Sequence, residues 1–203
     1  YRSSRGLGDV YKRQGDMSWV AVDGYTAATM LGISAQDGYA SMPEAYTWGN
    51  AFFGLVPGSI GETSTIAILL GLAILLVTKI ASYRIVGGVI LGTVVTSYFF
   101  NLVGSDTNPM FQMPFWWHMV MGGYAFGLVF MATEPVSGSH TNAGRWIYGF
   151  VIGFMVIMIR VLNPAYPEGM MLAILFGNLL SPLIDHFVVS RNISYRNKVL
   201  NAK

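Results

Sequence analysis

Five long apolar segments divide the chain, and each approaches the roughly 20 residues that a helix needs to cross a bilayer. Their approximate ranges are 62–78, 85–103, 115–133, 146–162 and 169–189. Because the bilayer core offers backbone groups no hydrogen-bond partners, segments of this length must form helices rather than open strands. Stretches such as ILLGLAILLV do not alternate as the strands of a β-barrel would. The pattern predicts an all-α membrane protein with about five transmembrane helices.

The composition supports this class. Of the 203 residues, 53% are hydrophobic and 11% are charged, whereas soluble domains carry about 25% charged residues. This balance excludes a soluble monomer, and it excludes a disordered chain because disorder needs low hydrophobicity and high net charge. The absence of Cys excludes a disulfide scaffold and any thiolate metal site within this chain.

Glycine pairs and isolated histidines are interpreted as structural features. Gly87–Gly88 and Gly122–Gly123 suit close contact between helices. His118 follows two Trp residues and is expected in an aromatic belt at the membrane interface, whereas His140 is expected in solvent. Neither histidine has the clustered partners that a metal site needs, so no metal site is predicted.

The basic residues are distributed unevenly around the five segments. Seven lie in connections predicted on one face: Lys79, Arg84, Arg145, Arg191, Arg196, Lys198 and Lys203. The opposite face has only Arg160, once the first fourteen residues are set aside. Because cytoplasmic loops accumulate Lys and Arg, we expect a cytoplasmic tail at 190–203 and an extracytoplasmic segment at 15–61.

The first fourteen residues, YRSSRGLGDVYKRQ, are basic and have no apolar core of the kind that a signal peptide contains. They resemble translated adapter sequence at the edge of a gene, and we expect them to be non-native. A disordered basic tail is the alternative. Without residues 1–14 the formal charge changes from +2 to −1, since eight basic and nine acidic residues remain.

A polar segment before the first apolar stretch contains Asp23-Gly24-Tyr25-Thr26-Ala27-Ala28-Thr29. A Thr hydroxyl flanked by such small residues can approach a large planar group or a phosphate, and local backbone amides can hold phosphate oxygens. From composition alone, the same segment also fits a plain loop or the start of a short helix.

Longer strings carry a family resemblance. The Thr26–Thr29 segment resembles a Ser-Gly-Ala-Thr motif on whose last Thr certain membrane subunits carry FMN as a phosphoester; Thr26 and Ala27 stand in place of Ser and Gly. Over residues 18–190 the chain resembles the B-subunits of the sodium-translocating NADH:quinone oxidoreductases. The supporting strings are PGSIGETST at 57–65, GSDTNPMFQMPFWWHMV at 104–120, FMATEPVS at 130–137 and RVLNPAYPEGMMLAILFGNLLSPLIDHFV at 160–188.

The resemblance implies a fold, a cofactor and partners. The chain would be roughly the C-terminal half of a ten-helix subunit in the bacterial inner membrane, inactive alone. FMN joined covalently to Thr29, beside Thr26, Ala27 and Ala28, would pass electrons toward a quinone with coupled sodium export. Riboflavin has a place in the full-length subunit. The expected partners are other subunits of the complex, quinone, sodium ion and membrane lipid, with no nucleic acid.

NADH oxidation is assigned to another subunit, because the chain has no Gly-rich dinucleotide fingerprint after a strand. No catalytic residue is assigned. The alternatives are the related D-subunit of the Rnf electron-transport complex, which shares the flavin motif, a transporter fragment without a redox group, and a scaffold that only holds neighbouring subunits.

Acidic residues near the apolar segments are candidates for an ion path. Asp185 interrupts an otherwise apolar stretch, and an acid there should face protein or water. A site near the membrane interface, with solvation or pairing to Arg191, is the alternative. Glu134 precedes a Pro where the third segment ends, so it is either a helix-ending carboxylate or an ion-path residue. Glu168 is expected to cap the N-terminus of the last helix.

Overall fold

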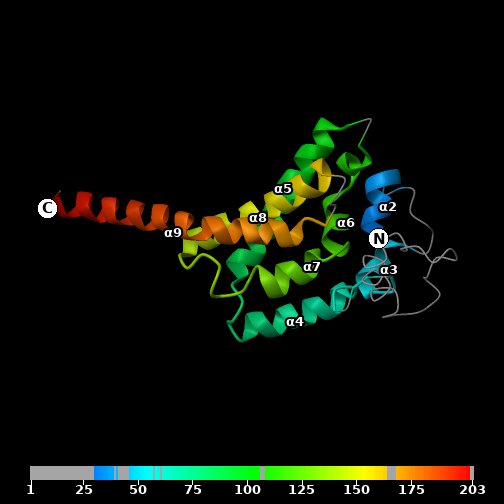
Figure 1. The fold of residues 1–203 in the computed structure, drawn as a ribbon. Helices are drawn as coiled ribbons and strands as arrows, with labels where there is room; N and C mark the ends of the chain where they lie inside the picture. The colour runs from blue at the N-terminus through cyan, green and yellow to red at the C-terminus, as the bar shows by residue number, and fades with distance from the viewer. Residues whose placement is uncertain are drawn as a thin grey trace, which may run out of the picture.

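The computed structural model describes residues 30–38, 40, 46–56, 58–59, 61–105, 108–163 and 168–201. Within them every regular element is helical (Figure 1), which confirms the predicted all-α class. The elements are α2 Met30–Asp37, α3 Trp48–Phe53, α4 Thr65–Val77, α5 Tyr83–Val103, η3 Pro109–Gln112, α6 Phe115–Val120, α7 Tyr124–Phe126, η4 Gly127–Met131, α8 Asn142–Leu162 and α9 Met170–Asn201.

Three helices in the described part of the chain are long and apolar enough to cross a membrane: α5, α8 and α9. The first predicted span is shorter than expected. Its helix α4 has 13 residues, about 20 Å, because Ser64 caps its start through Ala67 N–H and Lys79, with φ 60°, turns the chain after its end. The third predicted span is not one helix but α6, α7 and the π-helix η4.

Helix α8 packs between α5 and α9. Glycines let α5 and α8 approach at backbone distance. A Cβ on Gly88 would lie 2.7 Å from the Trp146 carbonyl oxygen, and a Cβ on Gly149 would lie 2.5 Å from the Ile85 carbonyl oxygen. Small residues in this spacing are typical of helix pairs in membranes, where close packing replaces the hydrophobic driving force.

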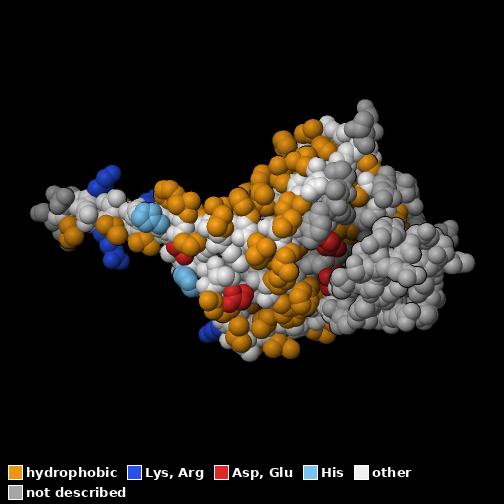
Figure 2. Space-filling view, in the orientation of Figure 1, with side chains coloured by type: hydrophobic (Ala, Val, Ile, Leu, Met, Phe, Trp, Pro, Cys, Tyr) orange, Lys and Arg blue, Asp and Glu red, His pale blue; other side chains and the backbone are white. Residues whose placement is uncertain are grey.

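Hydrophobic side chains cover the outer surface of the helices, as expected for a chain that faces lipid or other membrane helices (Figure 2). Helix α9 has 32 residues and continues well past the predicted span at 169–189, so most of the predicted tail is helical. Its last turns project away from the body (Figure 1). Lys and Arg side chains lie on this projecting end (Figure 2).

Candidate functional site: a broken helix beside the start of α2

The third apolar segment is interrupted between α6 and α7. Met121 has extended backbone, and Gly122 has φ 60°, a conformation that glycine adopts at little cost. A break of this kind leaves carbonyl and N–H groups without helical partners, and inside a membrane other protein groups must satisfy them. We call this interruption, with the side chains that bind it, the broken-helix site; it comprises His118, Met121, Gly122, Gly123, Arg160, Glu168 and Glu62.

Arg160 satisfies the carbonyl groups of the break. Its Nη1 donates to the His118 carbonyl at 2.7 Å and its Nη2 to the Met121 carbonyl at 3.0 Å, while Nε donates to the Glu168 carbonyl at 3.0 Å. The side chain is fully buried and its guanidinium lies 5.6 Å from the Tyr124 ring centre. The planar guanidinium therefore ties α8 to the end of α6 and to the segment before α9.

Glu168 satisfies the N–H side of the same break. Its Oε2 accepts a hydrogen bond from Gly123 N–H at 3.1 Å, where α7 begins. A Cβ on Gly122 would collide with the same carboxylate. The sequence predicts that Glu168 caps its own helix; the structure instead directs its carboxylate to the start of a different one.

A small cavity of about 40 Å³ adjoins this break. Its walls combine the buried start of α2, two carboxylates and small residues: Met30, Leu31, Val56, Gly58, Glu62, Thr63, Val120, Met121, Gly122 and Glu168. The volume suits about one water molecule and not a flavin ring. Because Met30 lines the cavity, the cavity lies beside the residue that directly follows Thr29 in the sequence.

The predicted flavin residues Thr26, Ala27, Ala28 and Thr29 lie outside the described residues. The described part of α2 begins at Met30, and both Met30 and Leu31 are buried. Ser34 Oγ donates to the Met30 carbonyl at 2.7 Å. The chain that directly follows Thr29 in the sequence is therefore held in place by packing.

His118 does not belong to an exposed aromatic belt, so this prediction was wrong. Its side chain is fully buried, and neither ring nitrogen has a hydrogen-bond partner among the described residues. The residue lies at the break, where the buried guanidinium of Arg160 binds its carbonyl. His140 is exposed, as predicted.

Asp185 lies at the end of the molecule opposite the broken-helix site, where its carboxylate holds the loop before α8. Its Oδ1 accepts from Ser139 Oγ at 2.5 Å, Thr141 Oγ1 at 2.6 Å and Thr141 N–H at 3.1 Å, and Oδ2 accepts from His140 N–H at 2.7 Å. Thr141 in turn caps α8 through Gly144 N–H. Asp185 thus fixes the start of α8 against the middle of α9.

Glu134 lies in the same loop, at the exit from η4. Its carboxylate accepts hydrogen bonds from Val136 N–H at 3.1 Å, from Ser137 N–H at 2.9 Å and from Ser137 Oγ. The Ser137 hydroxyl, followed by the backbone amides, lowers the pKa of the Glu134 carboxyl below its ordinary value. The two predicted ion-path acids, far apart in sequence, therefore meet at one loop, residues 134–141.

Sequence reasoning placed Arg160 in an outer connection and missed its role at the break. The available signal was a charged residue that interrupts the apolar stretch at 146–162, since such residues inside membranes pair with protein groups. Two of its three carbonyl partners, His118 and Met121, come from a distant segment, and neither spacing nor periodicity identifies them.

The helical membrane fold and its discontinuous helix define a multi-pass membrane protein of the kind that builds sites at helix breaks. The model of the NQR2, RnfD, RnfE family matches residues 11–194, and the chain belongs to this family. The match includes residues 11–14 of the predicted adapter segment at 1–14. The non-native origin of this segment stays a prediction.

Among curated proteins, the chain is similar to the B-subunits of Na(+)-translocating NADH-quinone reductases. It is 62% identical over 183 residues to the one from Azotobacter vinelandii and 58% identical over 184 residues to the one from Chromohalobacter salexigens. These alignments cover 90% and 91% of this chain but 45% of each relative. The chain therefore spans a little under half the length of these relatives.

Proposed function

We propose that this chain forms the flavin-bearing, C-terminal part of the B-subunit in a sodium-translocating NADH:quinone oxidoreductase. The supporting observation is its 58–62% identity, over nine tenths of its length, to proteins of that name. Those names describe one subunit of an enzyme, so the proposal places the chain in a complex with other subunits. It follows that the isolated part is inactive.

In this proposal, FMN is joined to Thr29 through a phosphoester and accepts electrons and passes them on toward a quinone. The protein holds the attachment point and shapes its surroundings. Met30 and Leu31, which directly follow Thr29 in the sequence, are buried and anchor α2. The neighbouring cavity of about 40 Å³ does not admit the flavin ring, so the ring lies outside it.

The broken-helix site gives this region its rigidity. Arg160 and Glu168 satisfy the carbonyl and N–H groups that the break exposes, and Met121 and Gly122 share the cavity wall with Met30. A rigid wall keeps the distance from the attachment point to neighbouring groups constant, and a fixed distance is what the protein contributes to electron transfer between bound cofactors.

The ion path is proposed at the opposite end, around loop 134–141. Asp185 and Glu134 supply carboxylate oxygens, which suit a hard cation. Asp185 already accepts four hydrogen bonds from this loop, so a passing sodium ion would have to replace some of these donors. The distribution of Lys and Arg supports an orientation in which this loop and the C-terminus face the cytoplasm and Thr29 faces outward.

An RnfD-type subunit is the second candidate, because the matching family model covers both kinds of protein. The high identity to relatives from the NADH-quinone reductases favours the first candidate. Both candidates carry a flavin, whereas a transporter or scaffold would not.

The test is in-gel flavin fluorescence. The full-length subunit, expressed together with the cell's flavin transferase, is denatured, separated on a gel and viewed under ultraviolet light. We expect a fluorescent band from the unsubstituted subunit. Thr29→Ala should abolish this band, whereas Thr26→Ala should weaken it or leave it in place. A dark band for the unsubstituted subunit, beside a fluorescent known flavoprotein from the same cells, would contradict the proposal. So would a Thr29→Ala band of full intensity.

A further inference from the structure

A cavity of about 490 Å³ opens at the end of the molecule that carries the projecting helix α9. It lies between the turn joining α4 to α5, the loop after η4 and the first turn of α8. Its walls are Leu76, Lys79, Ile80, Ala81, Ser82, Tyr83, Arg84, Ile85, Thr133, Glu134, Pro135, Gly138, Ser139 and Arg145. Its wall shares Glu134 and loop 134–141 with the proposed ion path, but its cations and the turn joining α4 to α5 have no part in the proposed flavin and ion roles.

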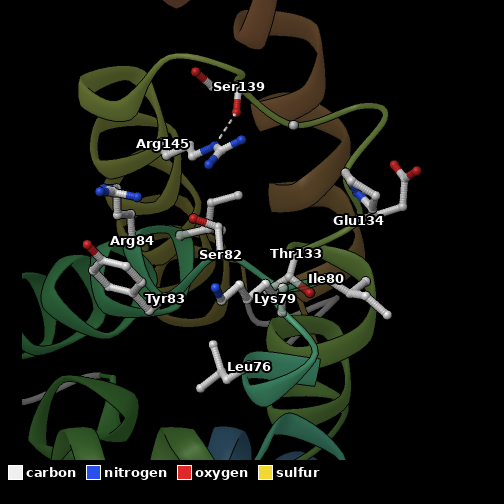
Figure 3. A pocket seen from close by; sticks show the side chains of 14 residues that line it. Leu76, Lys79, Ile80, Ser82, Tyr83, Arg84, Thr133, Glu134, Ser139 and Arg145 are labelled. Atoms are coloured by element: carbon white, nitrogen blue, oxygen red, sulfur yellow. Dashed lines mark hydrogen bonds between the residues drawn. The ribbon is translucent and has the colours of Figure 1, made fainter. Parts of the chain in front are cut away.

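The charge of the cavity is unbalanced. Three cations line it, Lys79, Arg84 and Arg145, against the single acid Glu134. Figure 3 shows the three cationic groups around Ser82, whereas the Glu134 carboxylate points away from them. That carboxylate is also engaged by the amides of Val136 and Ser137. The interior of the cavity is therefore positive.

Several hydrogen-bond donors that line the cavity have unused capacity within the described residues. Ser82 is the N-cap of α5, yet its hydroxyl makes no capping bond, and its buried Oγ has no partner among the described residues. The first N–H groups of a helix have no intrahelical acceptors. Arg145 uses its Nε for the Ser139 carbonyl at 3.3 Å, and Arg84 is held 4.6 Å from the Tyr83 ring centre. These donors face a common space and suit the oxygens of a phosphate.

The rim of the cavity is apolar. Ile80 and Tyr83 are 57% and 59% exposed. Leu76, close to the end of the apolar helix α4, adds a third apolar side chain. A free anion gains nothing from such a rim. A lipid, in contrast, places its phosphate among the cations and lays its acyl chains along exposed apolar side chains. Basic pockets between membrane helices are known to bind lipid head groups in this way.

We propose that this cavity binds the phosphate head group of an anionic phospholipid. Lys79, Arg84 and Arg145 neutralise the phosphate, Ser82 and the start of α5 donate hydrogen bonds to it, and Ile80 and Tyr83 contact the acyl chains. The bound lipid fills the space between α4, α5 and loop 134–141, and so links the short helix α4 to the rest of the molecule. The proposal does not depend on the flavin or on sodium transport.

The test uses the intact complex in phosphatidylcholine nanodiscs that contain a small fraction of photoactivatable phosphatidylglycerol. After illumination, mass spectrometry quantifies the cross-linked peptides. We expect cross-links on peptides from 76–85 and 133–145. Arg84→Gln should reduce their yield at limiting lipid by roughly fivefold, the contribution of one basic residue near an anionic lipid. The triple variant Lys79→Gln, Arg84→Gln, Arg145→Gln should abolish them.

The matched control is the triple variant Arg191→Gln, Arg196→Gln, Lys198→Gln, which removes the same charge from α9 outside the cavity. It should leave the cross-links unchanged, and Arg84→Lys with Arg145→Lys should retain most of them in a complex that assembles normally. Equal loss in both triple variants would overturn the proposal. It would also fall if added inorganic phosphate competed as well as unlabelled phosphatidylglycerol.

Discussion

Two charged residues interrupt apolar segments, and the side chain of each forms hydrogen bonds with groups outside its own helix. Arg160 donates to three carbonyls, and Asp185 accepts from two amides and two hydroxyls. A charge that is removed from water becomes tolerable when such partners replace the lost hydration. At the scale of single residues, the charged groups therefore determine where loops and helix ends are fixed.

The role of Asp185 can be divided by two substitutions. Asp185→Asn replaces a carboxylate oxygen with an amide donor that faces donors of loop 134–141, which should weaken this loop by about 2 kcal/mol. In the full complex we expect slower sodium-dependent quinone reduction. Ser139→Ala removes one donor but keeps the carboxylate, so it should leave the sodium dependence intact. The measurement is the quinone reduction rate against sodium concentration; unchanged sodium dependence in Asp185→Asn would contradict an ion-path role.

The pKa of the Glu134 carboxyl should lie below its ordinary value. Because its pKa is lowered in the folded protein, the turn at 134–137 is stabilised above the ordinary pKa and loses this contribution as the pH falls through the folded pKa. Ser137→Ala removes the largest cause and should raise the pKa toward the ordinary value. Carboxyl carbon chemical shifts measured against pH check this, and an identical titration in the variant would refute the assignment.

Two kinds of helix element coexist in this molecule. The pair α5 and α8 is continuous and packed through glycines, while the third apolar segment is broken and continues as the π-helix η4. π-Helical turns occur often at functional sites. The continuous pair provides a rigid frame, and the broken segment can present backbone groups at a membrane depth where an unbroken helix presents none.

The glycine contact between α5 and α8 predicts a large effect of one methyl group. Gly149→Ala would place a Cβ 2.5 Å from the Ile85 carbonyl oxygen, so the helices must separate. We expect a loss of about 3 kcal/mol, the upper end for overpacking, because backbone atoms cannot rotate away. The control is Gly49→Ala, where the nearest atom is Thr47 Oγ1 at 3.9 Å. Thermal unfolding of the purified subunit measures both; equal midpoints would contradict the packing argument.

For the whole molecule, the sequence predicted the class and most helix positions because apolar length is a local property. It also placed α5 and α8 close to their observed bounds. It did not predict the break at Gly122, since Arg160 and Glu168 stabilise it from 38 and 46 residues away along the chain. The basic cavity was missed for the same reason. Arg84 and Arg145 counted as topology signals, and only packing brings them together.

Helix α9 has one further consequence, which follows from its length. Its 32 residues span about 48 Å, and even at a tilt of about 40° it covers about 37 Å along the membrane normal, against a hydrocarbon thickness of about 30 Å. The end that carries Arg196 and Lys198 therefore extends past the hydrocarbon core into the head-group region. Because α9 is a continuous helix, this end holds its positive charges at a set depth relative to the lipid head groups of this face.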